Sequence, residues 1–325
     1  MASLPTFSDA QILAARPAKN EVDPWRSYGA LVEPERARSG QVEQVATLLL
    51  TNRECSFRCL MCDLWKNTTD LPVPQGAVAG QVREGLQRLG IDTADPVGSG
   101  VPHVKLYNSG NFFDPKAISL DDREEIASLV QEFQTVIVEN HPRLCGQQVI
   151  DFQDRLAHQL EVAIGLETAH EGILAQLNKQ MTLDDFLRAT QLLRENNIQV
   201  RSFILLKPPT LEEPEAISWA VKSVEFSLDA GADFCALIPL RAGNGMIEKL
   251  IDQGLHSPPT LGCLELALAE CLALGRGRIC VDLWDIERLV QCPACGPARI
   301  ARLEQMNLQQ EFLPLVDCPL GCEGK

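Results

Sequence analysis

Three cysteines stand close together at Cys55, Cys59 and Cys62, in a C-x3-C-x2-C spacing. The apolar, β-branched run 45–51 before them predicts a buried strand, so the thiols lie on the loop that follows it. Structural zinc takes four protein ligands, and a four-iron cluster ordinarily takes four cysteines. Three thiols without an obvious fourth predict a [4Fe-4S] cluster with one open iron. A zinc site and unrelated buried thiols are the alternatives.

A second group of cysteines lies near the end of the chain. A C-x2-C pair is followed by a 22-residue spacer and a C-x3-C pair, at Cys292, Cys295, Cys318 and Cys322. Glycine and proline near both pairs allow the tight turns of a four-thiolate site, and the arrangement is that of a zinc ribbon. We expect structural zinc here, and an auxiliary iron–sulfur cluster is the alternative.

Composition limits the partners of the chain. The 325 residues carry a net charge of −15 and twelve cysteines. The first twenty residues lack a signal peptide, and no apolar run is long enough to cross a membrane, so we expect a cytoplasmic protein with no membrane partner. The acidic charge weighs against a tRNA partner and favours a small-molecule substrate.

Strands and helices alternate from residue 45 onwards, which predicts an α/β protein with a parallel sheet wrapped by helices. Six such units form either a partial barrel or an open doubly wound sheet, and in both the chemistry belongs at the carboxyl ends of the strands. The expected strands are 45–51, 103–108, 135–139, 160–166, 199–206 and 233–240.

The three-cysteine motif after a first strand resembles that of the radical S-adenosylmethionine (SAM) superfamily. The resemblance implies a partial (β/α)6 TIM-like barrel over 45–250, an N-terminal extension over 1–44, and a helical C-terminal region over 251–325 with the four-cysteine metal site. Asn178-Lys179, the turn Lys207-Pro208-Pro209 and the stretch 107–114 are most similar to the elongator-like subgroup, which includes archaeosine synthase-type proteins.

The resemblance also implies a SAM site beside the open iron. Met61 stands where the superfamily usually has an aromatic residue, and Glu139 stands where a carboxylate accepts from the ribose hydroxyls. Lys207 and Arg241, two cations at strand ends, are the candidate catalytic residues, and Lys207 is also a candidate for the SAM carboxylate. The remaining implied SAM contacts are Asn108, Ser109, Gly110, Asn111, Gly165 and Glu167.

The implied reaction starts with one electron from a flavodoxin- or ferredoxin-type reductase. SAM is then cleaved to a 5'-deoxyadenosyl radical, which abstracts hydrogen from a small-molecule substrate. Whether the outcome is an oxidoreductase, lyase or isomerase reaction stays open. The alternatives are archaeosine-type lyase chemistry on tRNA, and a zinc-stabilised binding protein without catalysis.

Overall fold

A computed structural model describes residues 5–322, so the first four residues of the predicted extension and the last three of the predicted C-terminal region lie outside it. Eight strands form one sheet in the order of the sequence, β1 to β8. Its first two strands are antiparallel and the others parallel. Because the order never reverses, the doubly wound alternative is excluded. The strands are β1 Gly29–Arg36, β2 Val42–Leu49, β3 His103–Tyr107, β4 Thr135–Asn140, β5 Gln159–Glu167, β6 Gln199–Leu206, β7 Phe234–Pro239 and β8 Arg278–Val281.

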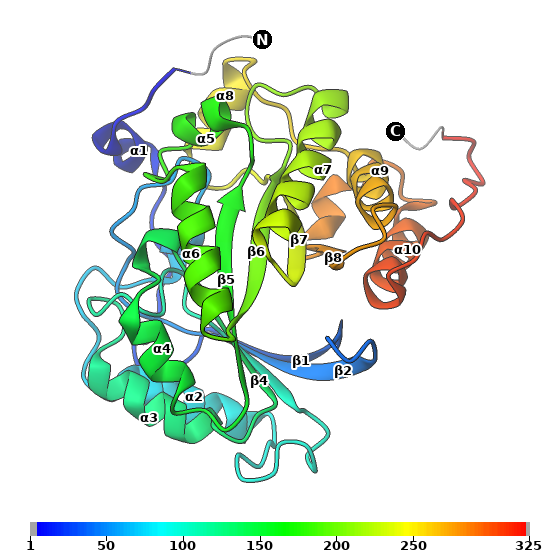
Figure 1. Ribbon diagram of the computed structural model, residues 1–325. Helices are drawn as coiled ribbons and strands as arrows, with labels where there is room; N and C mark the ends of the chain where they lie inside the picture. The colour runs from blue at the N-terminus through cyan, green and yellow to red at the C-terminus, as the bar shows by residue number, and fades with distance from the viewer. Residues whose placement is uncertain (1–4, 323–325) are drawn as a thin grey trace.

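The sheet curls into a half-barrel, with β1 and β2 at a steep angle to β5, β6 and β7 (Figure 1). The curl brings Arg201 of β6 to Glu35 of β1, with nitrogen–oxygen distances of 3.0 and 2.6 Å, although these strands are not neighbours in the sheet. Glu161 of β5 and Lys105 of β3 join the same buried network. The inner face is therefore lined by paired charges, and the predicted α/β partial barrel is confirmed.

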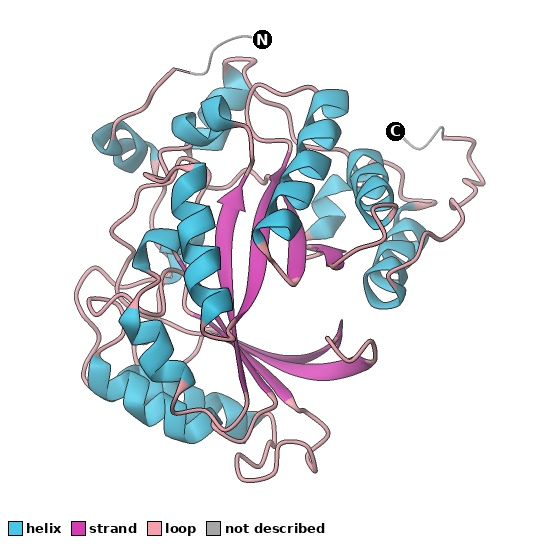
Figure 2. Ribbon diagram, in the orientation of Figure 1, coloured by secondary structure: helices cyan, strands magenta, loops and turns pink. Residues whose placement is uncertain are grey.

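Helices pack on the outer face of the curled sheet (Figure 2). Helix α6 contacts β5 and β6, and α7 contacts β5, β6 and β7. Among residues 5–322, no helix is both long and apolar enough to cross a membrane. The α-helices are α1 Asp9–Ala15, α2 Ala77–Arg88, α3 Leu120–Val130, α4 Gln147–Gln153, α5 Glu171–Gln176, α6 Leu183–Glu195, α7 Glu213–Ala230, α8 Met246–Asp252, α9 Leu261–Leu272 and α10 Gly296–Gln309.

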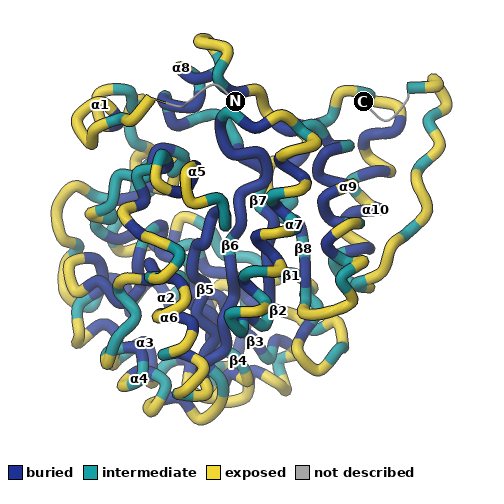
Figure 3. Tube along the Cα trace, turned by 45° about the horizontal axis from the view of Figure 1, so that its top comes forward, coloured by how far each residue is buried: buried dark blue, intermediate teal, exposed yellow. Residues whose placement is uncertain are grey.

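The central strands form the core, as Figure 3 shows by their burial. Leu48, Val138 and Ile164, on three different strands, are fully buried and belong to one apolar cluster. Burial on both faces explains why these strands appear in the sequence as nearly continuous apolar runs. The six predicted strands correspond to β2 through β7.

Two further strands extend the sheet beyond the six predicted ones. Strand β1 lies in the range predicted as the N-terminal extension, and β8 lies in the range predicted as the C-terminal region. Both pair with neighbouring strands of the same sheet. The sheet therefore continues past both ends of the range 45–250.

Helix α10 covers the free edge of β8, and it also contacts β1. The Asn307 side chain accepts from Val281 N at 2.9 Å and donates to Val281 O at 2.9 Å. Gln310 makes the same pair of bonds with Ile279, both at 2.7 Å. These amides satisfy main-chain groups that an edge strand would otherwise leave open to another chain.

Removing one of these amides should weaken the protein measurably. We expect Asn307→Ala to lower the free energy of unfolding by about 1–3 kcal/mol, because it leaves the Val281 N–H and C=O without their partner. Gln305→Ala, on an exposed position of the same helix, is the matched control. Urea unfolding of both variants measures the difference, and equal stability would contradict the role of Asn307.

Candidate functional site

The three-cysteine loop leaves the carboxyl end of β2 and is held in place by main-chain contacts. Leu60 N donates to Leu177 O at 2.8 Å, and Asn178 Nδ2 donates to the main-chain oxygen of Arg58 at 2.7 Å. From the segment after β7, Asn244 Nδ2 donates to Leu60 O at 2.7 Å. The loop is thus fixed between the ends of β5 and β7, at the edge where the parallel strands end.

The thiols of this loop are half-buried and influence one another electrostatically. Burial raises the pKa of Cys59 to about 12, against the lowering effect of the nearby Lys179 ammonium. Burial, followed by the charge of Cys59, also raises the pKa of Cys62. Metal binding requires the thiolate form, so a cationic centre here would have to displace protons.

The loop after β3 lies directly against the first thiol. Asn111 Nδ2 donates to the sulfur of Cys55 at 3.0 Å. A Cβ at Gly110 would lie 3.6 Å from the Cβ of Cys55, so the two backbones are close. The Tyr28 and Ser109 hydroxyls lie 2.8 Å apart and share a hydrogen bond. The predicted SAM-contacting stretch 108–111 is therefore next to the predicted cluster ligands.

Glu139 connects this loop to the end of β4. Its Oε1 accepts from Gly110 N at 3.2 Å, and the main-chain N–H groups of Asn108 and Ser109 also bond the carboxylate. Burial raises the pKa of Glu139 to about 7 despite these three donors. The carboxylate therefore holds the loop 108–110 against the end of β4, and its contact with the SAM ribose stays a prediction.

This raised pKa predicts a pH-dependent stability. Below pH 4.5, the pKa of Glu139 in the unfolded chain, the carboxyl is protonated in both states and does not affect the free energy of unfolding. As the pH rises from 4.5 to about 7, the unfolded state ionises more readily than the folded one, and the free energy of unfolding falls. We expect Glu139→Gln to gain about 1–3 kcal/mol in unfolding free energy over the unmodified protein between pH 5 and pH 8. Urea unfolding at both pH values measures it, with the exposed Glu132→Gln as control. A difference that does not change with pH would contradict the assignment.

A buried ion pair lies on the other side of the thiols. Glu167, at the end of β5, pairs with Lys179, whose charge acts on Cys59. Strand β5 is irregular between Gly165 and Glu167, and Glu167 has a φ of 67°. A side chain at Gly165 would overlap the Glu167 carboxylate and the Lys179 ammonium, so a larger residue there would displace this ion pair.

Aromatic stacking adds a contact that sequence patterns did not indicate. The rings of Phe57 and His141 stack with centroids 3.9 Å apart and an angle of 10° between planes. His141 Nε2 bonds Lys179 O at 3.0 Å. Burial lowers the pKa of His141 to about 3, so the ring is neutral and acts as a rigid wall of the loop. Met61 is half-buried and packs against two small apolar clusters.

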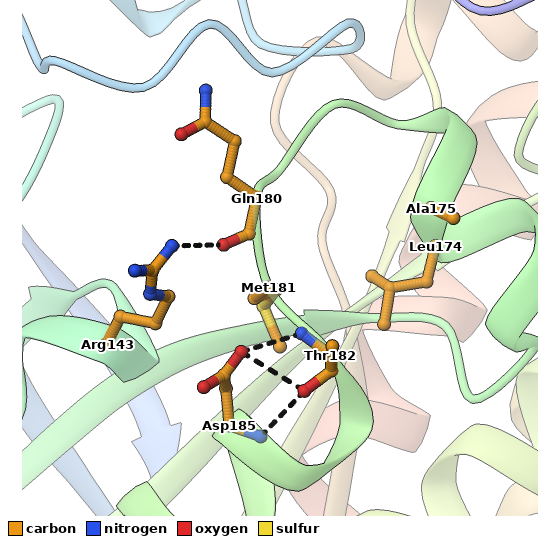
Figure 4. A pocket seen from close by; sticks show the side chains of 7 residues that line it. All are labelled: Arg143, Leu174, Ala175, Gln180, Met181, Thr182 and Asp185. Carbon is orange, nitrogen blue, oxygen red and sulfur yellow. Dashed lines mark hydrogen bonds between the residues drawn. The ribbon is translucent and has the colours of Figure 1, made fainter.

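A cavity between the segment 174–185 and Arg143 has no thiol among its lining residues (Figure 4). Its volume is about 340 Å³, and Arg143 closes one side by donating to Gln180 O at 2.9 Å. Asp185 and Thr182 bond each other in the N-terminal cap of α6. Arg143, Thr182 and Asp185 are therefore engaged in holding local structure.

The two candidate catalytic cations are engaged away from the cysteine loop. Lys207 Nζ donates to Ser257 Oγ at 2.6 Å. Arg241 pairs with Asp282 at 2.8 Å. The pKa values of the three thiols are affected by the charges of the other cysteines and of nearby side chains. Among the cations, Lys179 is the one that lowers the pKa of Cys55 and of Cys59. The catalytic roles of Lys207 and Arg241 stay predictions.

The four C-terminal cysteines converge in a single compact group. Their sulfur atoms all lie within 4.8 Å of one another. The Cys292–Cys318 and Cys295–Cys322 pairs are 3.7 and 3.4 Å apart. A hydrogen bond from Cys322 is the main cause that lowers the pKa of Cys318 to about 6. The predicted four-cysteine group is confirmed.

Two arginines of α10 tie this group to the rest of the fold. Arg299 bonds the Cys295 sulfur and pairs with Glu265 of α9 at 2.6 Å. Arg302 pairs with the same carboxylate at 3.2 Å and donates to Leu313 O at 2.7 Å. The segment after α10 is therefore held both by its cysteines and by its main chain.

Comparison with known proteins gives distant relatives, and no family model matches the chain. A protein of Methanocaldococcus jannaschii is 22% identical over 299 residues, which are 86% of this chain and 81% of the relative. Archaeosine synthase subunit beta of Thermococcus kodakarensis is 26% identical over 209 residues. The chain resembles the elongator-like radical SAM proteins, as its motifs predict.

The match to the archaeosine synthase subunits is partial. It covers 62% of this chain and 63% of the Thermococcus subunit. Among solved structures, Elp3 of Methanocaldococcus infernus has a TM-score of 0.48 at 14% identity, covering 71% of this chain and 58% of that one. The HemN coproporphyrinogen III oxidase of Escherichia coli has a TM-score of 0.44 at 13% identity, covering 82% and 56%.

Proposed function

We propose that the chain is a radical SAM enzyme whose cluster is held by Cys55, Cys59 and Cys62. The observation that carries the proposal is the set of three half-buried thiols on one pinned loop. Three thiolates suit a four-iron cluster with one iron left for a small ligand, whereas structural zinc takes four.

When bound, the cluster and SAM would supply one-electron cleavage of SAM and hydrogen abstraction from the substrate, with electrons from a flavodoxin- or ferredoxin-type reductase. The surrounding residues position these groups. Asn111 holds the Cys55 sulfur, and Lys179 offsets the charge of the Cys59 thiolate. Glu139 offers a carboxylate to the ribose hydroxyls and fixes the loop 108–110 beside them.

Anaerobic reconstitution with iron and sulfide tests this function. We expect a brown protein that produces 5'-deoxyadenosine from SAM when it is reduced. A colourless protein that binds zinc at Cys55, Cys59 and Cys62 would instead support the binding-protein alternative.

The substrate we propose is a small molecule, because the chain carries a net charge of −15. The second candidate is a tRNA-modifying reaction, favoured by the archaeosine synthase subunits among the relatives. Binding of tRNA at low salt, lost as salt is raised, would support the second candidate. Absence of binding at low salt would remove it.

For the C-terminal cysteines we propose a single structural zinc ion. A tetrahedral Zn–S distance of about 2.3 Å places the sulfur atoms roughly 3.8 Å apart. The observed 3.7 and 3.4 Å, with all four within 4.8 Å, are close to that spacing. In a four-iron cluster each thiolate binds a different iron, so the sulfur atoms would lie farther apart.

A further inference from the structure

A second cavity opens at the carboxyl end of β6, on the side of the barrel that faces α9 and the C-terminal region. Its volume is about 670 Å³, within the range of sites for small ligands. None of its lining residues belongs to the three-cysteine loop. The polar groups that line it include Lys207, Glu213, Ser257, Thr260, Arg288 and Gln291.

Lys207 is buried here without a counter-ion. Its residue is 3% exposed, and its backbone has a φ of 58° just after the end of β6. The hydrogen bond to Ser257 satisfies one of the three ammonium donors. Among residues 5–322, no carboxylate forms an ion pair with Lys207, and Glu213 instead accepts from Thr260 N at 2.9 Å. A buried, unpaired charge is costly unless a partner satisfies it.

A second polar group beside Lys207 is also unsatisfied. His256 is 7% exposed, and within the described part of the chain neither ring nitrogen has a hydrogen-bond partner. Burial, followed by the charge of Lys207, lowers the pKa of His256 to about 4, so the ring is neutral at pH 7. Among the residues that the structure describes, His256 has no partner and Lys207 has a single one, so buried bonding capacity remains that a ligand can satisfy.

We propose that this cavity binds a small ligand through an oxyanion, either a carboxylate or a phosphate, paired with the Lys207 ammonium. Arg288 lines the same cavity and pairs with Asp285 at 3.1 Å. Its side chain is 65% exposed, so it can also add a second charged contact to a ligand. Glu212 and Glu213 also line the cavity, so their charges would oppose the entry of a polyanion. The site is therefore suited to a small ligand with one anionic group rather than to a nucleic-acid backbone.

The inference is independent of the radical chemistry, and its test needs no reduced cluster. Calorimetric titration of the full chain with inorganic phosphate and, separately, with acetate at constant ionic strength measures binding. We expect one of these anions to bind, and the one that binds shows whether the site prefers phosphate or carboxylate. Lys207→Met should weaken the affinity for that anion about tenfold or more. Arg288→Gln should weaken it less, and the exposed Lys116→Met should bind like the unmodified protein.

Thermal unfolding without added anion distinguishes a binding role from a structural one. If Lys207 is kept for a ligand, Lys207→Met unfolds at the same or a higher temperature than the unmodified protein, because an uncompensated charge is removed. A clearly lower unfolding temperature would overturn the proposal. The proposal would also be overturned if neither anion bound, or if Lys207→Met bound the anion as tightly as the unmodified protein. If Lys207→Met does not fold, unchanged anion binding by both Arg288→Gln and Ser257→Ala would overturn the proposal.

Discussion

Replacing Cys59 with alanine is expected to remove the iron that reconstitution places in the protein, and with it the reductive cleavage of SAM. The cluster would keep two of its three protein ligands, and the open iron would lose its fixed position. Loss of supporting contacts around a metal already costs about tenfold to a hundredfold in affinity or activity, and loss of a ligand itself should cost at least as much. Iron analysis and 5'-deoxyadenosine production measure the two effects.

The matched control is Cys263→Ala, which removes a buried thiol from the apolar cluster of α9. It should retain iron and SAM cleavage, although it loses some stability through a small cavity. Asn111→Ala should lie between the two variants, because it removes the donor to the Cys55 sulfur but no ligand. Full iron content in Cys59→Ala would contradict the assignment of the loop.

The second large effect is expected at the C-terminal cysteines. Cys295→Ala should remove one zinc ion per chain and lower the free energy of unfolding by several kcal/mol, since metal binding contributes directly to folding. The segment 311–322 should then become more accessible to proteases, because only the Arg302 bonds and the packing of Leu313 would be left among its described contacts. Zinc analysis and limited proteolysis measure these changes.

Cys280→Ala is the control for this experiment, because Cys280 lies on β8 in the same region but outside the four-cysteine group. It should keep its zinc and its resistance to proteases. Iron bound at the first loop should be unchanged in both variants. If Cys295→Ala instead lost iron in place of zinc, the C-terminal group would hold an auxiliary cluster.

The sequence predicted the central strands well because they are buried on both faces. The apolar runs that become β2 through β7 carry their own signal. Strand β1 was missed because its residues Glu33, Pro34 and Glu35 do not resemble a buried strand. Their carboxylates are accommodated by Lys105 and Arg201, which come from distant parts of the chain. A pattern confined to one segment cannot show such partners.

The same limit applies to the candidate site. Asn111 and Glu139 were named because the segments around them resemble radical SAM motifs at strand ends, and their roles toward SAM stay predictions. The stack of Phe57 on His141 depends on two loops meeting, so neither residue stood out. Lys207 was expected beside SAM from its place at a strand end. In the structure it lines the second cavity and bonds Ser257, which its sequence position alone did not indicate.

Electron paramagnetic resonance of the reduced, reconstituted protein, recorded with and without SAM, tests the central claim most directly. A cluster with one iron not bound by the chain should give a signal that changes when SAM is added, because SAM occupies that position. A cluster signal that SAM leaves unchanged, or no cluster signal at all, would contradict the assignment of Cys55, Cys59 and Cys62 as ligands of an open [4Fe-4S] centre.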